Sequence, residues 1–458
     1  MYTEFFKLCG YEQDEIERER PRIDKAFKRL GLDTEDIRRG EKRVRELFDI
    51  ELEGVRKLLG IWMKELIDLV LAKDEGKKVV YGSYPPIKQA YMVPMYACED
   101  LYVTTPELVI DITMGSIFDK LNPILEAAEE NGLAPGLAHC SLLQARLGAL
   151  VKGMIPVPDL LLNSAHFCDQ TPKVDELIHE LYGATVAYMD SCWDQNWGDY
   201  PNLKERRIEY MGGRIDMAWQ TVEEVLGCQI TEESQHSAAR ENAKLWANYI
   251  TLTDFVAGCD PQPLSQVDQA LIFYFIVGVP TRHGEELNGA ISTLIREAKQ
   301  RFDRGKGVVE KGAPRVVWCV PSTVDPEILR MVEGLGLAVP LTIYAWLSPL
   351  ARSKTKHRAF AERIAESLLR DNMVFGTEGF IEYIKQMCRT WKLEGLIHYY
   401  PFSCRPISFP ALMIKKAVQD ELNIPVLALE ADWYDKRDYG VEQLRTRVET
   451  FAELLKAN

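Results

Sequence analysis

Residues 139–170, HCSLLQARLGALVKGMIPVPDLLLNSAHFCDQ, contain the pattern that decides the fold. After Cys140, leucines and alanines recur at helical spacing, and residues 159–162 form a short apolar run behind a Pro-rich turn. Cys168 comes just past that run. The stretch therefore predicts a helix followed by a buried strand, with one cysteine opening the helix and another beyond the strand.

The placement of these cysteines predicts a site. In an open parallel sheet, ligands bind in the crevice beyond the carboxyl ends of the strands, which is where Cys168 is expected. Cys140 precedes its helix, where free N–H groups and the helix dipole favour a thiolate. Cys404 follows a third apolar run, residues 396–400, in the same manner. Three thiolates converging from distant strand ends would indicate metal or cluster chemistry.

Composition limits the classes of function. The 458 residues are 47% hydrophobic and carry a net charge of −14, which argues against a nucleic-acid or anionic-membrane partner. No apolar run approaches the roughly 18 residues of a membrane span, and the N-terminus has no signal-peptide pattern. We expect a cytoplasmic protein with no membrane association. Its ten cysteines are then expected to be buried or ligating rather than in disulfides.

Short apolar runs alternate with helical patterns in two parts of the chain, residues 77–199 and 304–458. This alternation predicts an α/β protein with two lobes, each built on a parallel sheet. Helical patterns prevail in an N-terminal region, residues 1–76, and in a connecting region, residues 200–303. Another short apolar piece, residues 92–97, ends at Cys98. The expected strands are residues 79–84, 159–162, 185–189, 315–320, 339–344, 396–400 and 426–429.

Three segments together resemble a known family. They are CSLLQARLGALVKGMIPVPDLLLNSAHFCDQTPK at 140–173, GLIHYYPFSCRPISFPALMIKKAVQDELNIPVLALEADWYD at 395–435, and LRTRVETFAELL at 444–455. The order of the cysteines, the PDLLL and NIPVL strands and the RTR helix is similar to that of the 2-hydroxyacyl-CoA dehydratase and benzoyl-CoA reductase superfamily, which includes double-cubane cluster proteins. The resemblance runs from Val79 to the C-terminus and leaves out the N-terminal helices.

The resemblance implies two Rossmann-like lobes around a cleft that holds an oxygen-sensitive iron–sulfur cluster. It implies a separate ATP-hydrolysing iron–sulfur activator that injects a low-potential electron. The sequence has no G-x-x-x-x-G-K-[ST] loop, so ATP hydrolysis is expected in that partner. Cys140, Cys168 and Cys404 match the three ligand positions of the family.

The remaining cysteines decide between two kinds of cluster. Cys319 and Cys192 each end or follow an expected strand, and Cys98 stands where family members have a Pro-Glu pair. These three with the first three would make six thiolates, about the number for a double-cubane 8Fe-9S cluster, whereas a 4Fe-4S cluster with an open iron needs three. Each of them alone is more often a packed core residue. Three others are expected to be structural: Cys228, Cys259 and Cys388.

Three further residues are candidates for catalysis. Ser83, after the first strand, resembles a family position near the substrate, although a turn hydroxyl before two prolines has a simpler explanation. Glu99 retains the acidic residue of the Pro-Glu pair. His166, like His139 and His398, lies close to a cysteine and could donate a hydrogen bond to cluster sulfur or a proton to substrate, but a satisfied structural histidine is the commoner case.

Two mechanisms compete within the family. In the first, a homodimer carries double-cubane clusters that reduce small molecules with electrons from the activator, and the six strand-end cysteines favour this iron–sulfur oxidoreductase. In the alternative, the chain is one subunit of a heterodimeric 2-hydroxyacyl-CoA dehydratase or benzoyl-CoA reductase with a single 4Fe-4S cluster and an acyl-CoA substrate. A remote alternative is a non-catalytic scaffold that binds zinc or no metal.

Overall fold

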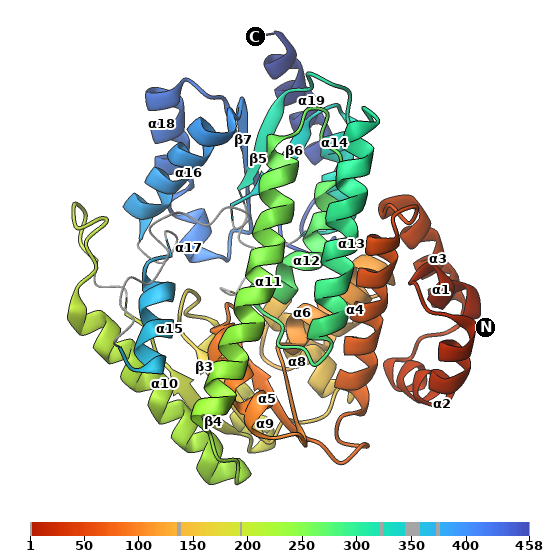
Figure 1. Ribbon diagram of the computed structural model, residues 1–458, viewed down its shortest axis with the longest axis vertical. Helices are drawn as coiled ribbons and strands as arrows, with labels where there is room; N and C mark the ends of the chain where they lie inside the picture. The colour runs from red at the N-terminus through yellow and green to blue at the C-terminus, as the bar shows by residue number, and fades with distance from the viewer. Residues whose placement is uncertain are drawn as a thin grey trace.

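Two four-stranded sheets form the centre of the molecule (Figure 1). The computed structural model describes residues 2–134, 139–192, 195–319, 324–343, 358–371 and 376–457. Every strand pair in both sheets is parallel. The prediction of an α/β protein with parallel sheets is therefore confirmed.

The first sheet has the strand order β2-β1-β3-β4. Its central strand β1 pairs with β2 on one side, where Tyr81 is opposite Thr104, and with β3 on the other, where Tyr81 is opposite Leu161. All five residues of β3 are buried, as expected for an interior parallel strand. The strands are β1 (Lys78–Gly82), β2 (Leu101–Thr104), β3 (Leu160–Ser164) and β4 (Thr185–Met189).

The second sheet has the order β6-β5-β7-β8 and repeats the topology of the first. In both sheets the strand order reverses beside the first strand of the lobe, between β1 and β3 and between β5 and β7. Such reversal points open a crevice at the carboxyl edge of a sheet, where ligands bind in doubly wound proteins. The strands are β5 (Arg315–Cys319), β6 (Ala338–Thr342), β7 (Gly395–Tyr400) and β8 (Val426–Glu430).

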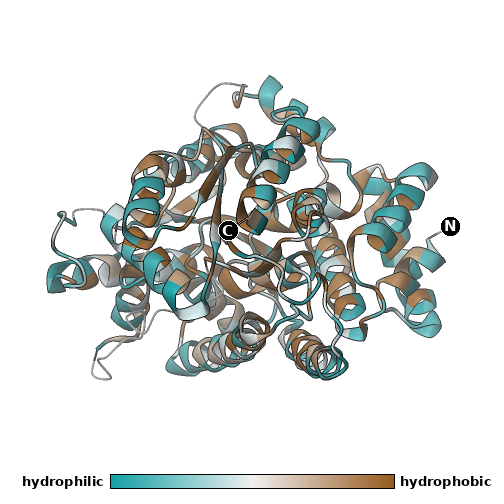
Figure 2. Cartoon of the chain, turned by 90° about the horizontal axis from the view of Figure 1, so that it is seen from above, coloured by the Kyte–Doolittle hydropathy of each residue, from teal (hydrophilic) through white to brown (hydrophobic). Residues whose placement is uncertain are grey.

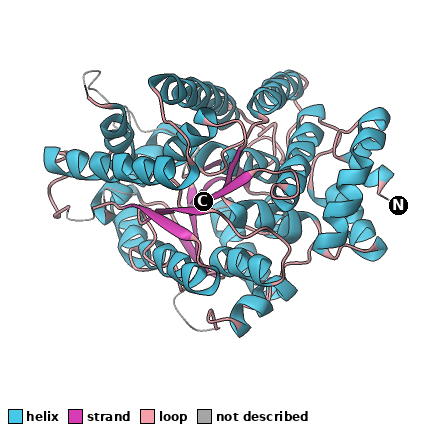
Figure 3. Cartoon of the chain, turned by 90° about the horizontal axis from the view of Figure 1, so that it is seen from below, coloured by secondary structure: helices cyan, strands magenta, loops and turns pink. Residues whose placement is uncertain are grey.

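Helices enclose both sheets (Figure 3), with hydrophobic residues concentrated on the strands and on the inward helix faces (Figure 2). The helices between the strands of the first sheet are α5 (Lys88–Ala97), α6 (Pro106–Ile110), the π-helix η1 (Asp111–Ile117), α7 (Asn122–Glu130), α8 (Ser141–Val151) and α9 (Thr171–Tyr182). The corresponding helices of the second half are α14 (Pro326–Gly334), α15 (Phe360–Leu369), α16 (Thr377–Trp391), α17 (Arg405–Ser408), α18 (Ala411–Leu422) and α19 (Val441–Ala457).

The N-terminal helices lie on one side of the molecule (Figure 1). Of these, α4 is the most deeply buried, and its Trp62 donates a hydrogen bond of 2.9 Å to the carbonyl of Leu271. Arg43 on α3 forms ion pairs with Asp325 and Glu327 at the start of α14, which ties this region to the second sheet. The helices are α1 (Thr3–Leu8), α2 (Gln13–Leu30), α3 (Thr34–Leu47) and α4 (Glu53–Leu71).

Four long helices connect the two sheets: α10 (Glu205–Leu226), α11 (Glu232–Gly258), α12 (Gln266–Val277) and α13 (Gly284–Asp303). Figure 1 shows α11 running from the level of β4 to the level of β5. At its far end, Arg315 at the start of β5 donates hydrogen bonds to the carbonyls of Ala257 and Cys259. The helix therefore bridges the two sheets.

Some local predictions were wrong. Residues 92–97 are not a separate apolar piece but the end of α5, because Tyr91, Met92 and Val93 pack as one buried helical surface. The next strand, β2, has only four residues and was missed. The connecting region is helical as predicted, and its apolar run 270–279 lies mostly in α12, which is buried on almost every side.

The positions of the domain boundaries stay a prediction. The described residues contain no helix that is both long enough and apolar enough to cross a bilayer.

The contact between α4 and α13 provides a test of pH-dependent stability. Burial opposes the charged form of His283, but its hydrogen bonds to Asp68 (2.9 Å) and Glu286 outweigh burial and raise the pKa of His283 to about 10. A raised pKa in the folded state stabilises most at low pH and loses its effect as pH rises towards 10. We expect His283→Gln to cost about 1 kcal/mol at pH 6 and progressively less up to pH 10, by urea denaturation.

The control is His236→Gln, which changes an exposed histidine on α11 and should leave the free energy of unfolding unchanged at every pH. A cost for His283→Gln that grows with pH would contradict the assignment.

Candidate functional site

Cys140 lies at the start of α8, as the sequence predicts. It is the N-cap residue of this helix and is half-buried. The next residue, Ser141, joins it to a second loop: its backbone N–H donates to Asp432 (3.2 Å), and its hydroxyl accepts from the N–H of Tyr434 (3.3 Å). The loop after β8 is therefore fixed against the start of α8.

Cys168 lies in the loop between β3 and α9, beyond the carboxyl end of the strand, and is half-buried. Cys404 is the N-cap residue of the short helix α17, four residues after β7 ends. The residues that follow these two cysteines, Asp169 and Arg405, form an ion pair across the two halves of the molecule. The carboxyl edges of the two sheets therefore meet at these loops.

The three thiols lie close enough to affect one another. Burial raises the pKa of Cys140 well above its usual range, and Asp432, Cys404 and Cys168 raise it further. Burial and Cys168 likewise raise the pKa of Cys404. Without a cation, the raised pKa values of Cys140 and Cys404 keep these two side chains as neutral thiols at pH 7. A bound metal group would supply the positive charge that lets them ionise together.

The three candidate ligands are thiols, which iron–sulfur clusters and zinc both select. Among the described residues, no three His, Cys, Asp or Glu side chains have the geometry to hold one metal ion. The thiolates of an iron–sulfur cubane bind different irons, so they stand farther apart than the ligands of one zinc ion. The three cysteines are half-buried and lie on separate loops.

A charged network lies under the first carboxyl edge, at the reversal point between β1 and β3. Arg146 on α8 forms an ion pair of 2.5 Å with Asp175 on α9, and its guanidinium lies 3.9 Å from Glu107 on α6. Ser83 donates its hydroxyl to Asp175 (2.6 Å), and Asn163 at the end of β3 donates to the same carboxylate (2.5 Å). All five side chains are fully buried.

This network fixes the orientation of the Ser83 hydroxyl. Its hydroxyl is held by Asp175 and also accepts from Arg146 (3.3 Å), so Ser83 is a positioned residue rather than a free turn hydroxyl. Burial raises the pKa of Glu107 to about 7, although Arg146 opposes the shift. Four site residues carry no signal in the sequence and were not predicted: Arg146, Glu107, Asp175 and Asp432.

Two of the predicted catalytic residues occupy very different places. His166 is buried two residues before Cys168, and its ring Nδ1 has no hydrogen-bond partner among the described residues. Burial lowers the pKa of His166 to about 4, so its ring is neutral. Glu99 is exposed, just before β2 begins, at the amino edge of the sheet. The structure therefore separates Glu99 from the loops that carry Cys140, Cys168 and Cys404.

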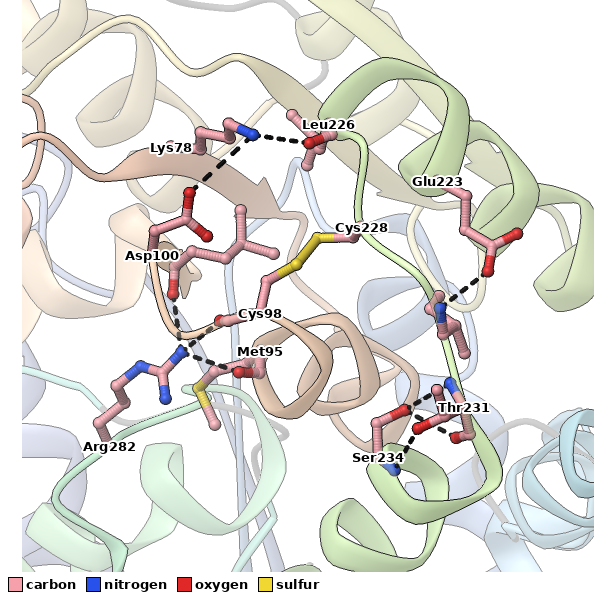
Figure 4. The surroundings of a disulfide bond; sticks show 12 residues. Lys78, Met95, Cys98, Asp100, Glu223, Leu226, Cys228, Thr231, Ser234 and Arg282 are labelled. Atoms are coloured by element: carbon pink, nitrogen blue, oxygen red, sulfur yellow. Dashed lines mark hydrogen bonds and ion pairs between the residues drawn. A yellow bond between two sulfur atoms is a disulfide. The ribbon is translucent and has the colours of Figure 1, made fainter.

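Cys98 is not a free thiol. It forms a disulfide with Cys228 (Figure 4). Cys98 comes just before β2 begins, whereas Cys168 comes after β3 ends, so the pair lies at the opposite edge of the first sheet. The prediction of Cys98 as a ligand does not match this arrangement, because the residue ends helix α5 rather than a strand. The expectation that no cysteine forms a disulfide was wrong for this pair.

The two other candidate cysteines do follow strands. Cys192 comes three residues after β4 and is half-buried, with its sulfur 3.9 Å from the carbonyl of Arg207. Cys319 is the last residue of β5 and is fully buried opposite His398 of β7. Burial raises the pKa of Cys319 well above its usual range, and Cys388 adds to this shift. Cys319 therefore packs inside the second half of the molecule.

The comparison with protein families extends over most of the chain. The family model described as 2-hydroxyglutaryl-CoA dehydratase, D-component, matches residues 101–455.

Curated relatives are distant. The chain is 21% identical over 313 residues to the alpha subunit of (R)-2-hydroxyglutaryl-CoA dehydratase from Acidaminococcus fermentans, covering 66% of this chain and 62% of the relative. It is 21% identical over 338 residues to the (R)-phenyllactyl-CoA dehydratase alpha subunit of Clostridium sporogenes, covering 70% and 77%. A putative dehydratase subunit of Escherichia coli, YjiM, is 24% identical over 251 residues, covering 51% and 61%. The chain thus spans less than two thirds of the first relative.

The buried network makes a stability prediction. Asp175→Asn removes the carboxylate nearest to Arg146 and leaves the guanidinium with Glu107 at 3.9 Å. Breaking a buried ion pair leaves an uncompensated charge, so we expect a loss of about 3 kcal/mol in the free energy of unfolding by urea denaturation. Asp420→Asn, at an exposed position of α18, is the matched control. Equal stabilities of the two variants would contradict a structural role for the pair.

Proposed function

Because the chain belongs to the family of the 2-hydroxyglutaryl-CoA dehydratase D-component, we propose that it is an iron–sulfur subunit of an acyl-CoA dehydratase. In this proposal, Cys140, Cys168 and Cys404 hold one 4Fe-4S cluster. The substrate class is a 2-hydroxyacyl-CoA, in line with the names of the relatives from Acidaminococcus and Clostridium.

One observation carries the proposal. The three thiols come from loops of both halves of the molecule, and Cys404 and Cys168 lie close enough to Cys140 to raise its pKa. Three protein ligands would leave one iron open, and the cluster would supply that Lewis-acidic iron and a low-potential electron for a thioester carbonyl. Soft thiolates are the ligands that such a cluster selects.

Residues of the chain itself would orient the substrate. Ser83 is held by Asp175 and Arg146 at the reversal point between β1 and β3, and we assign it to the alignment of a substrate oxygen. His166 lies two residues before Cys168, its ring Nδ1 has no partner in the part of the chain that the structure describes, and we assign it a hydrogen bond to the bound substrate. Dehydration needs the leaving hydroxyl to be placed, and hydrogen bonds from positioned side chains can do this.

A double-cubane reductase is the second candidate. Cys192 favours it, since this half-buried cysteine lies beyond the carboxyl end of β4, the same edge as Cys168. Two observations count against the double-cubane reductase. Cys98 is bound in a disulfide, and Cys319 is packed inside the second half of the molecule. The relatives with specific names are dehydratase subunits, so we place this reading second.

The partners follow from the same proposal. Electrons would come from an ATP-hydrolysing iron–sulfur activator, and a second subunit would complete the enzyme, as the alpha-subunit names of two relatives indicate for those proteins.

Large apolar side chains beside Cys404 are unusually exposed: Phe402 at 76%, Phe409 at 75% and Leu412 at 79%. Apolar patches of this kind are typical of protein interfaces, and we place a partner subunit there.

Iron content tests the cluster. We expect anaerobically reconstituted protein to bind about four irons per chain, with matching acid-labile sulfide. Cys404→Ala should lose most of this iron, because one of the three cluster ligands is removed. The visible charge-transfer absorption of the cluster should be lost with it. Cys388→Ala, a buried cysteine on α16, should keep both signals.

Other outcomes would redirect the assignment. About eight irons per chain would favour the double-cubane reductase. Zinc, or no metal at all, would favour a scaffold without redox chemistry. Full iron content in Cys404→Ala would remove that residue from the ligand set.

A further inference from the structure

The Cys98–Cys228 disulfide lies on the far side of the first sheet from the proposed cluster ligands. The Cα atoms are 6.1 Å apart, a separation that natural disulfides span. Cys98 ends α5, and Cys228 lies in the short turn between α10 and α11. The bond therefore joins elements that are 130 residues apart in the sequence.

The surroundings fix both ends of the bond (Figure 4). Arg282 donates to the carbonyls of Met95 (2.8 Å) and Cys98 (2.7 Å), and so holds the end of α5. On the other side, Lys78 of β1 donates to the carbonyl of Leu226 (2.7 Å), just before the turn with Cys228. The two sulfurs are thus held together by contacts that do not depend on the bond.

The two cysteines differ in access. Cys98 is half-buried, whereas Cys228 is 3% exposed. Thiol–disulfide exchange starts at the accessible sulfur and finishes at the protected one. The half-buried Cys98 is therefore expected to react first with a small disulfide, and Cys228 to resolve the product.

We propose that Cys98 and Cys228 form a redox-modification site that reacts with low-molecular-weight disulfides and thiols. In a reducing environment the two cysteines are free thiols. In an oxidising environment they form the disulfide. This inference is independent of the proposed function, since neither cysteine belongs to the proposed cluster ligands.

The reaction balances without a metal. The Cys98 thiolate attacks one sulfur of glutathione disulfide and releases one glutathione thiolate. The Cys228 thiolate then attacks the Cys98 sulfur of the mixed disulfide and releases the second. The protein loses two electrons and two protons, and one glutathione disulfide becomes two glutathione molecules.

The bond acts on the helix that bridges the sheets. The turn with Cys228 leads directly into α11, whose far end is held by Arg315 of β5. Closing the bond attaches the near end of α11 covalently to α5. Oxidation therefore stiffens the connection between the first sheet and the second, which together carry the loops of the proposed cluster site.

The experiment uses the full chain with Cys140, Cys168 and Cys404 replaced by serine, so that cluster loading cannot affect the result, and the unsubstituted chain in parallel. Each is equilibrated anaerobically with glutathione disulfide or with dithiothreitol, without unfolding. Peptide mapping should find the Cys98–Cys228 link only after oxidation. The melting temperature should be about 5 °C higher in the oxidised form, because a crosslink that closes a long loop restricts the unfolded chain.

Variants separate the pair from other thiols. Cys98→Ser and Cys228→Ser should each abolish the difference in melting temperature, whereas Cys388→Ser should retain it. Hydrogen exchange in the turn before α11 should slow on oxidation in the parent protein and in Cys388→Ser. It should not change in Cys98→Ser or Cys228→Ser. The proposal is overturned if the link never forms, if dithiothreitol cannot reduce it in the folded protein, or if both redox forms melt at the same temperature.

Discussion

Parallel pairing of all eight strands is the constraint on which the rest of the structure depends. Because parallel strands all end at one edge, the loops after them gather on that side of each sheet. The Asp169–Arg405 ion pair and the hydrogen bonds between Ser141 and the loop at Asp432 bring the two edges together. Three cysteines that are far apart in the sequence meet there for topological reasons.

The parts of the site that follow from topology could be predicted from the sequence. Cys140, Cys168 and Cys404 were recognisable because each stands at the end of a clear helix or strand pattern. The same argument failed for Cys98, since residues 92–97 are apolar enough for a strand but belong to α5. Only the position of the turn between α10 and α11, which is a tertiary property, shows that Cys228 lies beside it.

The buried charges could not be predicted. Arg146 sits in a helix where a single arginine normally marks the exposed face, yet it is fully buried between Asp175 and Glu107. Its partners come from α6 and α9, so no local pattern connects them. Burying these charges costs desolvation free energy, so the ion pairs need not add to the stability of the fold. This is consistent with a role in holding Ser83.

The residues matched by the family model do not include every strand of the first sheet. The matched range begins at residue 101, but β1, which lies between β2 and β3, ends at Gly82. A version of the chain that starts at residue 101 would lack this inner strand, leaving β2 without its neighbour and the backbone of β3 unpaired on one side. The limits of sequence similarity are therefore not limits for truncation, since the first sheet is complete only when the chain includes β1.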